Sequence, residues 1–415
     1  MKVLVVQKGA REHFLAARAL SKCGALAGLV TDLKAPRSQR LRRWLGNIPS
    51  ALVKRWLASE IVGVPEDKVI TMGWAVIPIR TIPVVAAKFG KRYDGYVASD
   101  RLFARAVVKL RLPEHDAVFA YSYAAKEVLE VAQRRGIFTI LDQIDPGPVE
   151  ADLVEGEMAR WPDYVKTLQR VPEHYWNRLQ AEWKLADLIL VNSRWSREAL
   201  LEQGVDAGKI EILPLAYEAN SEKLKAESGN VQPSTFNSQP STAPLRVLWL
   251  GQVCIRKGIQ YLVEAARILK GRSVRIIVAG PIEIARDAIR AAPDNIEWVG
   301  PVVRDEVSNL YRRADLFVLP TISDGFAITQ LEAMAHGVPV IATPRCGEVV
   351  VDGLTGYLVP ACDGQALAAA IQRFIDDRGL SGKMRESCLQ RAKEFSLDAY
   401  ASHLLELIGP PSPAK

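Results

Sequence analysis

Short apolar runs alternate with helical segments along this chain, and this alternation constrains the fold more than any other feature. Five runs of four to six residues stand out in the first half: Val3–Val6, Leu26–Thr31, Ala117–Tyr121, Phe138–Leu141 and Leu188–Val191. Segments with helical periodicity, such as Ala124–Arg135, lie between them. The pattern predicts β-α-β units and therefore a parallel sheet.

The alternation stops near residue 219 and restarts near residue 245. Ser228–Pro244 has no charged residue, four serines and three prolines, which is the composition of a linker. Four strands are predicted after it: Arg246–Leu250, Val274–Val278, Leu316–Pro320 and Val340–Thr343. Because 415 residues are too many for one ordinary core, we predict an α/β protein of two Rossmann-like domains that face each other across a cleft.

The predicted boundaries follow the linker. The N-terminal domain takes residues 1–218, the linker 219–244 and the C-terminal domain 245–395. Residues 396–415 are expected to form a helix and a tail that pack back on the N-terminal domain. In open parallel sheets ligands bind beyond the carboxyl ends of the strands, so the cleft is the expected site.

Composition excludes several classes of protein. A hydrophobic content of 49% and a charged content of 24% are typical of a soluble globular chain. No apolar run approaches the ~18 residues of a membrane span, and the run in MKVLVV ends at Gln7, as in a first strand rather than a signal peptide. The five scattered cysteines include no C-x-x-C, which argues against a disulfide framework or zinc site and favours the cytoplasm.

Positive charge is concentrated in residues 34–111, which hold sixteen Lys or Arg and five Asp or Glu. Within the basic residues 34–56, the stretch RSQRLRRWLGNIPSALVKRW (37–56) mixes cations with tryptophan and aliphatic residues, which suits an anionic membrane surface at the inner face of the membrane. A pair of ordinary amphipathic helices with a solvated basic face explains it equally well. Nucleic acid is not expected, because no recognisable nucleic-acid-binding module is present.

The first stretch with chemical content is LWLGQVCIRKGIQYL (248–262), a strand followed by a loop and a helix. The strand ends at Gly251, and the loop brings Arg256 and Lys257 to the start of the helix. Two cations and the free N–H groups of a helix N-terminus form an anion-binding site.

The second stretch, SDGFAITQLEAMAHG (323–337), places two acids eight residues apart, Asp324 and Glu332, around the start of an apolar helix predicted over Phe326–His336. Its loop contains Gly325, and the helix start offers three unpaired amides, those of Phe326, Ala327 and Ile328. Carboxylates accept hydrogen bonds from hydroxyl groups but repel phosphate. A nucleoside-diphosphate sugar satisfies both conditions, because its anionic diphosphate lies between two hydroxylated ends.

Three motifs together resemble a known family. The patterns G-x4-R-K-G, D-G-F-x5-E-A-M-A-x-G-x-P-V-I-A-T and V-x-D-G-x-T-G-Y-L-V are similar to the donor domain of glycosyltransferase family 4, also called glycosyl transferases group 1. The resemblance is strong over residues 245–380 and weaker over 1–218. It implies the GT-B fold, with Glu332 on the ribose hydroxyls, Asp324 and the following amides on the donor sugar, and Lys257 on the diphosphate.

The chain departs from this family at several positions. Gln252 replaces the arginine that follows the first glycine, so Arg256 is expected to substitute for it. Ala327 and Cys346 stand where the family has glycines. Asp142 begins a loop where many relatives carry a histidine, and an acid cannot mimic an imidazole donor.

Further candidates follow the strands of the first half. Gly9 would let the backbone approach a ligand at the end of the first strand. Ser122, Asp142 and Ser193 each follow a parallel strand and should line the cleft, either in an acceptor or catalytic role or as helix caps. His336 is expected to be a helix-terminal residue rather than a catalyst.

The resemblance also implies a mechanism. We expect no metal, because no D-x-D triplet is present, and we expect Lys257, Arg256 and helix dipoles to stabilise the departing diphosphate. Asp324 and Asp142 complete the catalytic candidates. The function implied is a retaining glycosyltransferase that moves a hexosyl group from a nucleotide sugar to a glycan or lipid-linked acceptor, in polysaccharide or glycolipid biosynthesis.

Two other functions use similar parts. A GT-B epimerase or hydrolase would bind the same donor, and only a requirement for an acceptor would distinguish it from a transferase. A dinucleotide oxidoreductase should show G-x-G-x-x-G after a strand, and neither half does.

Overall fold

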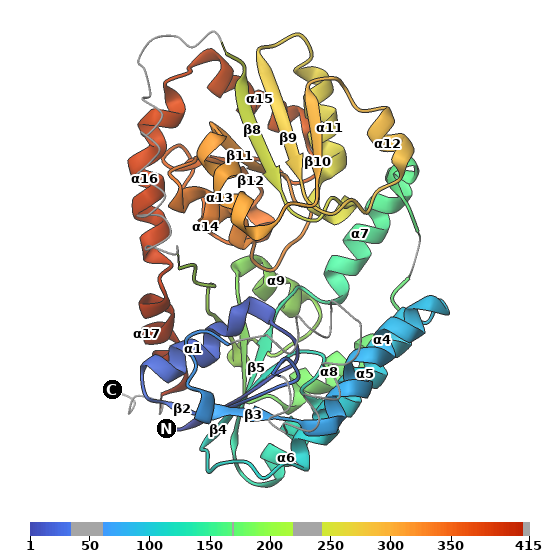
Figure 1. Ribbon diagram of the computed structural model, residues 1–415, viewed down its shortest axis with the longest axis vertical. Coiled ribbons are helices and arrows are strands. Elements are labelled where there is room, and N and C mark those ends of the chain that lie inside the picture. The colour runs from blue at the N-terminus through green and yellow to red at the C-terminus, as the bar shows by residue number, and fades with distance from the viewer. Residues whose placement is uncertain (35–60, 168–169, 219–242, 410–415) are drawn as a thin grey trace.

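The computed structural model describes residues 1–34, 61–167, 170–218 and 243–409. Figure 1 shows two α/β domains, one above the other, each built on its own parallel sheet. The prediction of two Rossmann-like domains is therefore confirmed. The basic stretch 37–56 and nearly all of the predicted linker lie outside the described residues.

The N-terminal sheet has the strand order β3-β2-β1-β4-β5-β6-β7. Its strands are β1 (Val3–Gln7), β2 (Leu26–Thr31), β3 (Val69–Thr71), β4 (Ala117–Tyr121), β5 (Phe138–Gln143), β6 (Leu188–Val191) and β7 (Ile210–Ile212). All five residues of β1 are buried, because helices cover both faces of the sheet. Continuous apolar strands are the consequence of this double burial.

Helices cover the two faces of this sheet unequally. The helices of the domain are α1 (Leu15–Lys22), α4 (Val76–Lys88), α5 (Arg92–Val108), α6 (Lys126–Arg134), α7 (Pro148–Arg160), α8 (Glu173–Leu185) and α9 (Arg194–Glu202). The core on one face includes residues of α1, whereas the core on the other includes residues of α4, α5, α6 and α8.

The C-terminal sheet has the order β10-β9-β8-β11-β12-β13. Its strands are β8 (Leu245–Leu250), β9 (Val274–Ala279), β10 (Ile296–Gly300), β11 (Leu316–Leu319), β12 (Val340–Ala342) and β13 (Gly356–Leu358). Its helices are α11 (Ile259–Ile268), α12 (Arg286–Arg290), α13 (Arg304–Arg313), α14 (Ile328–Ala335), α15 (Gly364–Asp376) and α16 (Leu380–Glu394). The helix predicted from Phe326 begins two residues later, at Ile328.

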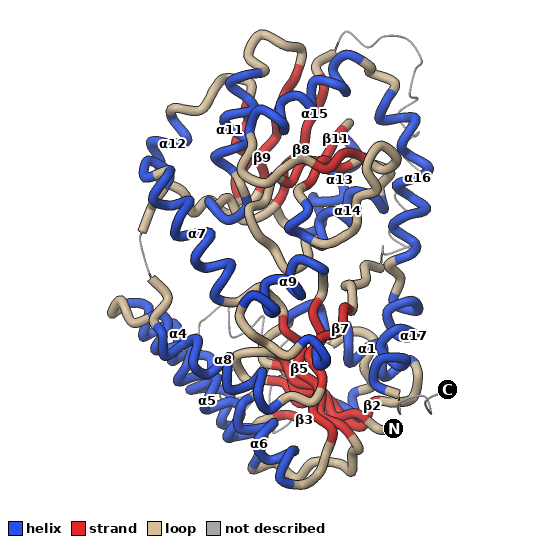
Figure 2. Tube along the Cα trace, turned by 180° about the vertical axis from the view of Figure 1, so that it is seen from behind, coloured by secondary structure: helices blue, strands red, loops and turns tan. Residues whose placement is uncertain are grey.

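The last helix, α17 (Leu397–Ile408), returns to the N-terminal domain. Figures 1 and 2 both show it beside α1, and Lys22 of α1 forms an ion pair with Asp398. The Ser396 side chain accepts a hydrogen bond from the Ala399 amide and so caps this helix where it leaves α16.

The two domains meet at the carboxyl ends of their strands. The loop after β5 and the loop after β11 lie against each other, at Ile144 and Gly325. Helix α7 begins beside this contact, and a β-bridge joins Val165, which follows α7, to Ile284 of the C-terminal domain. No helix within the described ranges is long and apolar enough to cross a membrane.

Candidate active site

Two loops of the C-terminal domain are interlocked at the carboxyl ends of the neighbouring strands β8 and β11. Gly258 has a φ of +71°, and a Cβ at this position would overlap the carbonyl oxygen of Pro320. The Ile322 amide donates to the Arg256 carbonyl at 2.9 Å, and the Thr321 hydroxyl donates to the same oxygen at 3.1 Å. The interlock fixes the backbone that carries Arg256 and Lys257.

The predicted cations and the first acid are brought together. Lys257 forms an ion pair with Asp324, and Arg256 Nη1 lies 3.5 Å from Asp324 Oδ1. Burial and the neighbouring Arg256 guanidinium lower the pKa of Lys257 to about 8. Without a ligand, Asp324 therefore neutralises part of the positive charge at this site.

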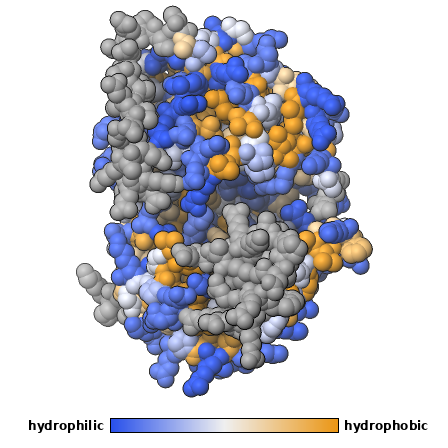
Figure 3. Space-filling model, viewed as in Figure 1, coloured by the Kyte–Doolittle hydropathy of each residue, from blue (hydrophilic) through white to orange (hydrophobic). Residues whose placement is uncertain are grey.

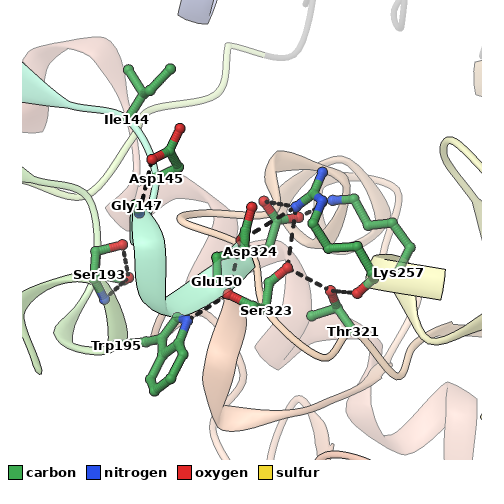
Figure 4. A network of polar contacts seen from close by, with 12 residues as sticks. Ile144, Asp145, Gly147, Glu150, Ser193, Trp195, Lys257, Thr321, Ser323 and Asp324 are labelled. Atoms are coloured by element: carbon green, nitrogen blue, oxygen red, sulfur yellow. Dashed lines mark hydrogen bonds and ion pairs between the residues drawn. The ribbon is translucent and has the colours of Figure 1, made fainter. Parts of the chain in front are cut away.

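The N-terminal domain contributes a second acid, Glu150 of α7, which the sequence did not single out as a ligand residue. Ser323 Oγ donates to the Glu150 carboxylate at 2.8 Å and accepts from the indole N–H of Trp195 at 2.9 Å. Arg256 Nη1 lies 3.7 Å from the same carboxylate. Figure 4 shows these residues of both domains around Asp324 and Lys257.

Gly325, predicted to bind the ligand, lies at the contact between the domains. A Cβ on this residue would lie 2.5 Å from the Ile144 carbonyl oxygen and 2.9 Å from Asn192 Nδ2. Glycine is required here because the backbones of the two domains approach so closely.

The start of α14 differs from the prediction of three free amides. The Ala327 amide donates to the Cys346 carbonyl at 3.0 Å and is not available to an anion. Phe326 is buried, and its ring fills the space beside Gly347, where a Cβ would lie 2.6 Å from it. The loop before the helix is itself held by the Asp324 amide, which donates to the Arg345 carbonyl at 2.8 Å.

Glu332, the second acid of the predicted pair, does not contact Arg256 or Lys257 and is instead hydrogen-bonded to Tyr311. The Tyr311 hydroxyl donates to its carboxylate at 2.9 Å. Burial raises the pKa of Glu332, while the Tyr311 hydrogen bond and the Arg304 charge act in the opposite direction. His336 Nδ1 lies 2.7 Å from the Glu332 carbonyl oxygen, and its ring stacks on Tyr311. His336 therefore holds the helix end in place.

Asp142 belongs to a carboxyl pair on the N-terminal domain rather than to the cation site. It lies beside Glu12, and burial together with this neighbour raises its pKa well above the usual range. Burial raises the pKa of Glu12 to about 7. Glu12 has a φ of +50°, unusual for a residue other than glycine, and it accepts a long hydrogen bond from Tyr121 at 3.4 Å. Each carboxyl acts on the pKa of the other, because two neighbouring buried carboxyls do not readily ionise together.

The remaining predicted residues lie at the expected ends of strands. Gly9 has a φ of +77°, and its amide donates to Asp32 at 2.7 Å. Ser193 caps α9 by accepting from the Ser196 amide, so capping accounts for its side chain. The Gly251 carbonyl packs against Gly280, where any side chain would overlap it.

No cluster of three His, Cys, Asp or Glu side chains in the described part of the chain is placed to hold a metal ion. The acids at the cation site instead neutralise Lys257 and Arg256.

Sequence reasoning missed three groups at this site: Glu150, Trp195 and Tyr311. Glu150 lies on a helix whose pattern is mixed, and Tyr311 lies 21 residues before Glu332, on the preceding helix. Nothing in the local sequence of either residue indicates its partner in space. Glu150 and Trp195 contact Ser323 of the other domain, and only the three-dimensional structure shows these contacts.

Residues 244–377 match the family model described as Glycosyl transferases group 1. The match includes both loops of the cation site and Glu332. It covers the larger part of the C-terminal domain and none of the first sheet.

Curated proteins are also similar to this chain. A putative colanic acid biosynthesis glycosyltransferase, WcaL of Salmonella typhimurium, is 29% identical over 58% of this chain and 61% of its own length. The amylovoran biosynthesis glycosyltransferase AmsK of Erwinia amylovora is 29% identical over 45% of the chain and 47% of its own length. A D-inositol 3-phosphate glycosyltransferase of Salinispora arenicola is 31% identical over 39% and 40%. The chain thus spans about two-fifths to three-fifths of the relatives it matches.

Solved structures extend the likeness to the whole chain. Anabaena HepE in complex with UDP superimposes with a TM-score of 0.60 at 15% identity, over 98% of this chain and 99% of that chain. The chain has the GT-B fold. The sucrose-phosphate synthase of Thermosynechococcus elongatus shares it, with a TM-score of 0.60 at 20% identity over 98% of both chains. In the GT-B fold of this chain, the cation site lies where the two domains meet.

Proposed function

We propose that the chain is a retaining glycosyltransferase that transfers a hexosyl group from a nucleoside-diphosphate sugar to a glycan or a lipid-linked acceptor. The observation that carries the proposal is the site formed by Arg256, Lys257 and Asp324 at the ends of two neighbouring strands. These residues lie in the part of the chain that matches the glycosyl transferases group 1 model.

The cations would bind the diphosphate of the donor. Lys257 and Arg256 are held at the interlocked loops, so little reorganisation would be needed when negative charge develops on the leaving group. Once the diphosphate pairs with the cations, Asp324 is released from them and can accept hydrogen bonds from the hydroxyls of the donor sugar.

Glu332 would bind the ribose. Its carboxylate accepts one hydrogen bond from Tyr311 and retains lone pairs for a vicinal diol. Glu332 and Asp324 would thus have separate roles, because one acid binds the ribose hydroxyls and the other binds the hydroxyls of the donor sugar. Burial raises the pKa of Glu332, and the Tyr311 hydrogen bond and the Arg304 charge offset part of this rise and favour the carboxylate form that the role needs.

Binding without a metal ion and retention of configuration are parts of the same proposal. The acceptor would attack on the face from which the diphosphate leaves, and the leaving phosphate would take the acceptor proton. This needs no protein nucleophile, and the positive charges of Lys257 and Arg256 substitute for a metal ion on the diphosphate.

The comparisons support transfer over the alternative of an epimerase or hydrolase. Two relatives are named for colanic acid and amylovoran biosynthesis, both as glycosyltransferases. One structural neighbour was solved with UDP-glucose, which makes UDP-sugars the first donors to test. Product formation that requires an acceptor distinguishes transfer from hydrolysis or epimerisation.

Calorimetric titration without metal tests the donor site. UDP-, GDP- and ADP-glucose would be titrated into the wild type, Lys257→Ala and Glu332→Ala, with Lys270→Ala and Glu386→Ala as matched controls on the surface of the same domain. We expect one nucleotide sugar to bind, each site variant to weaken it by more than about 1.4 kcal/mol, or tenfold, and the controls to bind as the wild type does. Equal binding by the site variants would refute the assignment.

A further inference from the structure

The loop that joins β5 to α7 lies at the contact between the two domains and is fixed there. The Ile144 carbonyl accepts from Asn192 Nδ2 at 3.1 Å and lies against Gly325 of the C-terminal domain. Further along the loop, the Gly147 amide donates to the Asp145 carboxylate at 3.0 Å. A loop held in this way keeps the Asp145 side chain in one orientation.

The carboxylate of Asp145 uses only one of its two oxygens within the protein. Oδ1 accepts from the Tyr123 hydroxyl at 2.7 Å, from Gln143 Nε2 at 3.2 Å and from the Gly147 amide at 3.0 Å. Oδ2 has no hydrogen-bond partner among the described residues, and it is not enclosed by them. Because each carboxylate oxygen can accept hydrogen bonds, Oδ2 is a fixed acceptor that lacks a donor.

The support of Asp145 exceeds what a turn requires. Asp206 of the same domain forms the equivalent turn with a single bond, from the Gly208 amide at 3.0 Å. Tyr123, by contrast, is itself held for its contact with Asp145: it has a φ of +74°, and its amide donates to the buried Glu182 at 2.6 Å. Side chains that bind a ligand are typically oriented by a second set of contacts of this kind.

Asp145 lies beside the cation site, on the domain opposite to Asp324. Figure 4 shows it next to the start of α7, on the side of the network that the N-terminal domain contributes. The pKa of Glu150 is raised by burial and also by the charge of Asp145, so these two carboxylates are near each other. Arg256 lies 3.7 Å from Glu150. Figure 3 shows hydrophilic residues in the recess between the domains.

The chemistry of Oδ2 selects the group that can meet it. A phosphate would be repelled by a carboxylate oxygen, whereas a hydroxyl group would donate a hydrogen bond to it. The roles proposed for Asp324 and Glu332 already account for the hydroxyls at both ends of the donor. The acceptor is the hydroxylated group that remains.

We propose that Asp145 binds the acceptor, an uncharged sugar ring, by accepting a hydrogen bond at Oδ2 from a hydroxyl next to the one that attacks. The inference rests on the proposed function, because it needs a donor bound on the opposite domain. The attacking hydroxyl still gives its proton to the leaving phosphate, so Asp145 orients the acceptor and takes no proton. The contacts of Oδ1 hold the carboxylate before the acceptor enters, which reduces the cost of binding.

The variant Asp145→Asn tests this contact with little disturbance of the loop. The carbonyl oxygen of asparagine can keep the three hydrogen bonds of Oδ1, while an amide N–H donor takes the place of Oδ2. The substitution therefore reverses the polarity of the one free position. Asp206→Asn makes the same change in the equivalent turn and is the matched control.

The assay measures transfer from the nucleotide sugar that binds in the calorimetric titrations. The acceptors are the methyl α- and β-pyranosides of glucose, galactose and mannose, and then the monodeoxy analogues of the pyranoside that reacts fastest. We expect Asp145→Asn to lower kcat/KM for the acceptor about ten- to hundredfold, as for a lost hydrogen bond to a charged group. Donor affinity, the midpoint of thermal unfolding and the Asp206→Asn control should match the wild type.

The deoxy analogues identify the contact itself. One of them should react with the wild type as slowly as the parent pyranoside reacts with Asp145→Asn. Removal of that hydroxyl should cost the variant nothing further, because the two changes delete the same interaction. A change in the fold of the loop would instead lower the rates with all analogues alike.

Four results would overturn the proposal. They are an unchanged kcat/KM in Asp145→Asn, an equal loss in Asp206→Asn, deoxy effects that all persist in the variant, and no transfer to any of these pyranosides by a wild type that binds the donor. Weaker donor binding by Asp145→Asn would assign the residue to the donor sugar and would also overturn it. If the wild type binds no nucleotide sugar, the proposed function fails, and this inference falls with it.

Discussion

Replacing Glu150 with glutamine should strengthen donor binding, although the residue lies at the site and is hydrogen-bonded there. Arg256, Lys257, Asp324 and Glu150 carry two positive and two negative charges, so the site is close to neutral before a diphosphate enters. Asp324 lies on the same domain as the cations. Glu150 approaches from the other domain and is the acid that an incoming diphosphate can displace more easily.

The magnitude follows from the distance between Arg256 and Glu150. At 3.7 Å the attraction of two unit charges is about 1 kcal/mol in water and about 4.5 kcal/mol at an effective dielectric constant near 20. Because the Arg256 side chain is 29% exposed, the lower value applies best. We therefore expect the donor to bind about fivefold more tightly to Glu150→Gln, whose amide oxygen can still accept from Ser323.

Calorimetry at pH 7.5, with the nucleotide sugar that binds in the titrations proposed above, measures this change. Glu157→Gln is the matched control, because Glu157 lies two turns further along the same helix and accepts a cross-domain hydrogen bond from Tyr261 rather than pairing with Arg256 or Lys257. The control should leave donor affinity within about twofold of the wild type. Unchanged or weaker binding by Glu150→Gln would refute the competition between Glu150 and the diphosphate. An equal increase in Glu157→Gln would instead indicate a general loosening of the contact between the domains.

Three further outcomes test particular contacts. Lys257 has a pKa of about 8, so above pH 8 its neutral amine must take up a proton before it can pair with the diphosphate. Donor affinity should therefore fall up to tenfold for each pH unit above 8. Calorimetric titration from pH 7 to 9.5 should show this fall in the wild type and not in Lys257→Arg. Gly258→Ala would clash with Pro320 and should lower the midpoint of thermal unfolding by more than about 5 °C, measured by calorimetry. Burial and the neighbouring Glu12 raise the pKa of Asp142, so the wild type should lose stability relative to Asp142→Asn as pH rises from about 4, the usual value for an unfolded Asp, through that raised pKa. Chemical unfolding at pH 4 and 7 should show a gain of more than about 1 kcal/mol for the variant only at the higher pH.

The sequence predicted the buried strands well because they are apolar on both faces. The predicted strands Leu26–Thr31, Ala117–Tyr121 and Leu188–Val191 coincide with β2, β4 and β6. Strands β3, β7 and β13 have three residues each and lie at or near the edges of the sheets, where so short a segment carries no recognisable period. Helix α4 was missed because its apolar residues show no amphipathic pattern.

The site could be predicted in part because its residues lie in two local motifs. Arg256, Lys257 and Asp324 each follow a strand, and neighbouring parallel strands bring their ends together. Which groups each residue contacts was not predictable, since Glu150 and Trp195 approach from the other domain. The occupied amide of Ala327 likewise depends on a loop that follows β12.

The return of α17 to the N-terminal domain affects how this protein can be recombined with its relatives. A chimera that takes the C-terminal sheet from one parent and the N-terminal sheet from another needs two junctions, one in the linker and one between Phe395 and Ser396. With a single junction, the foreign α17 would be placed against α1, where it must supply a partner for Lys22 and place a ring at Tyr400 beside Glu12 and Asp142. To exchange donor preference, the segment between the two junctions should therefore be taken from one parent. The terminal helix and the first 218 residues should both come from the other parent.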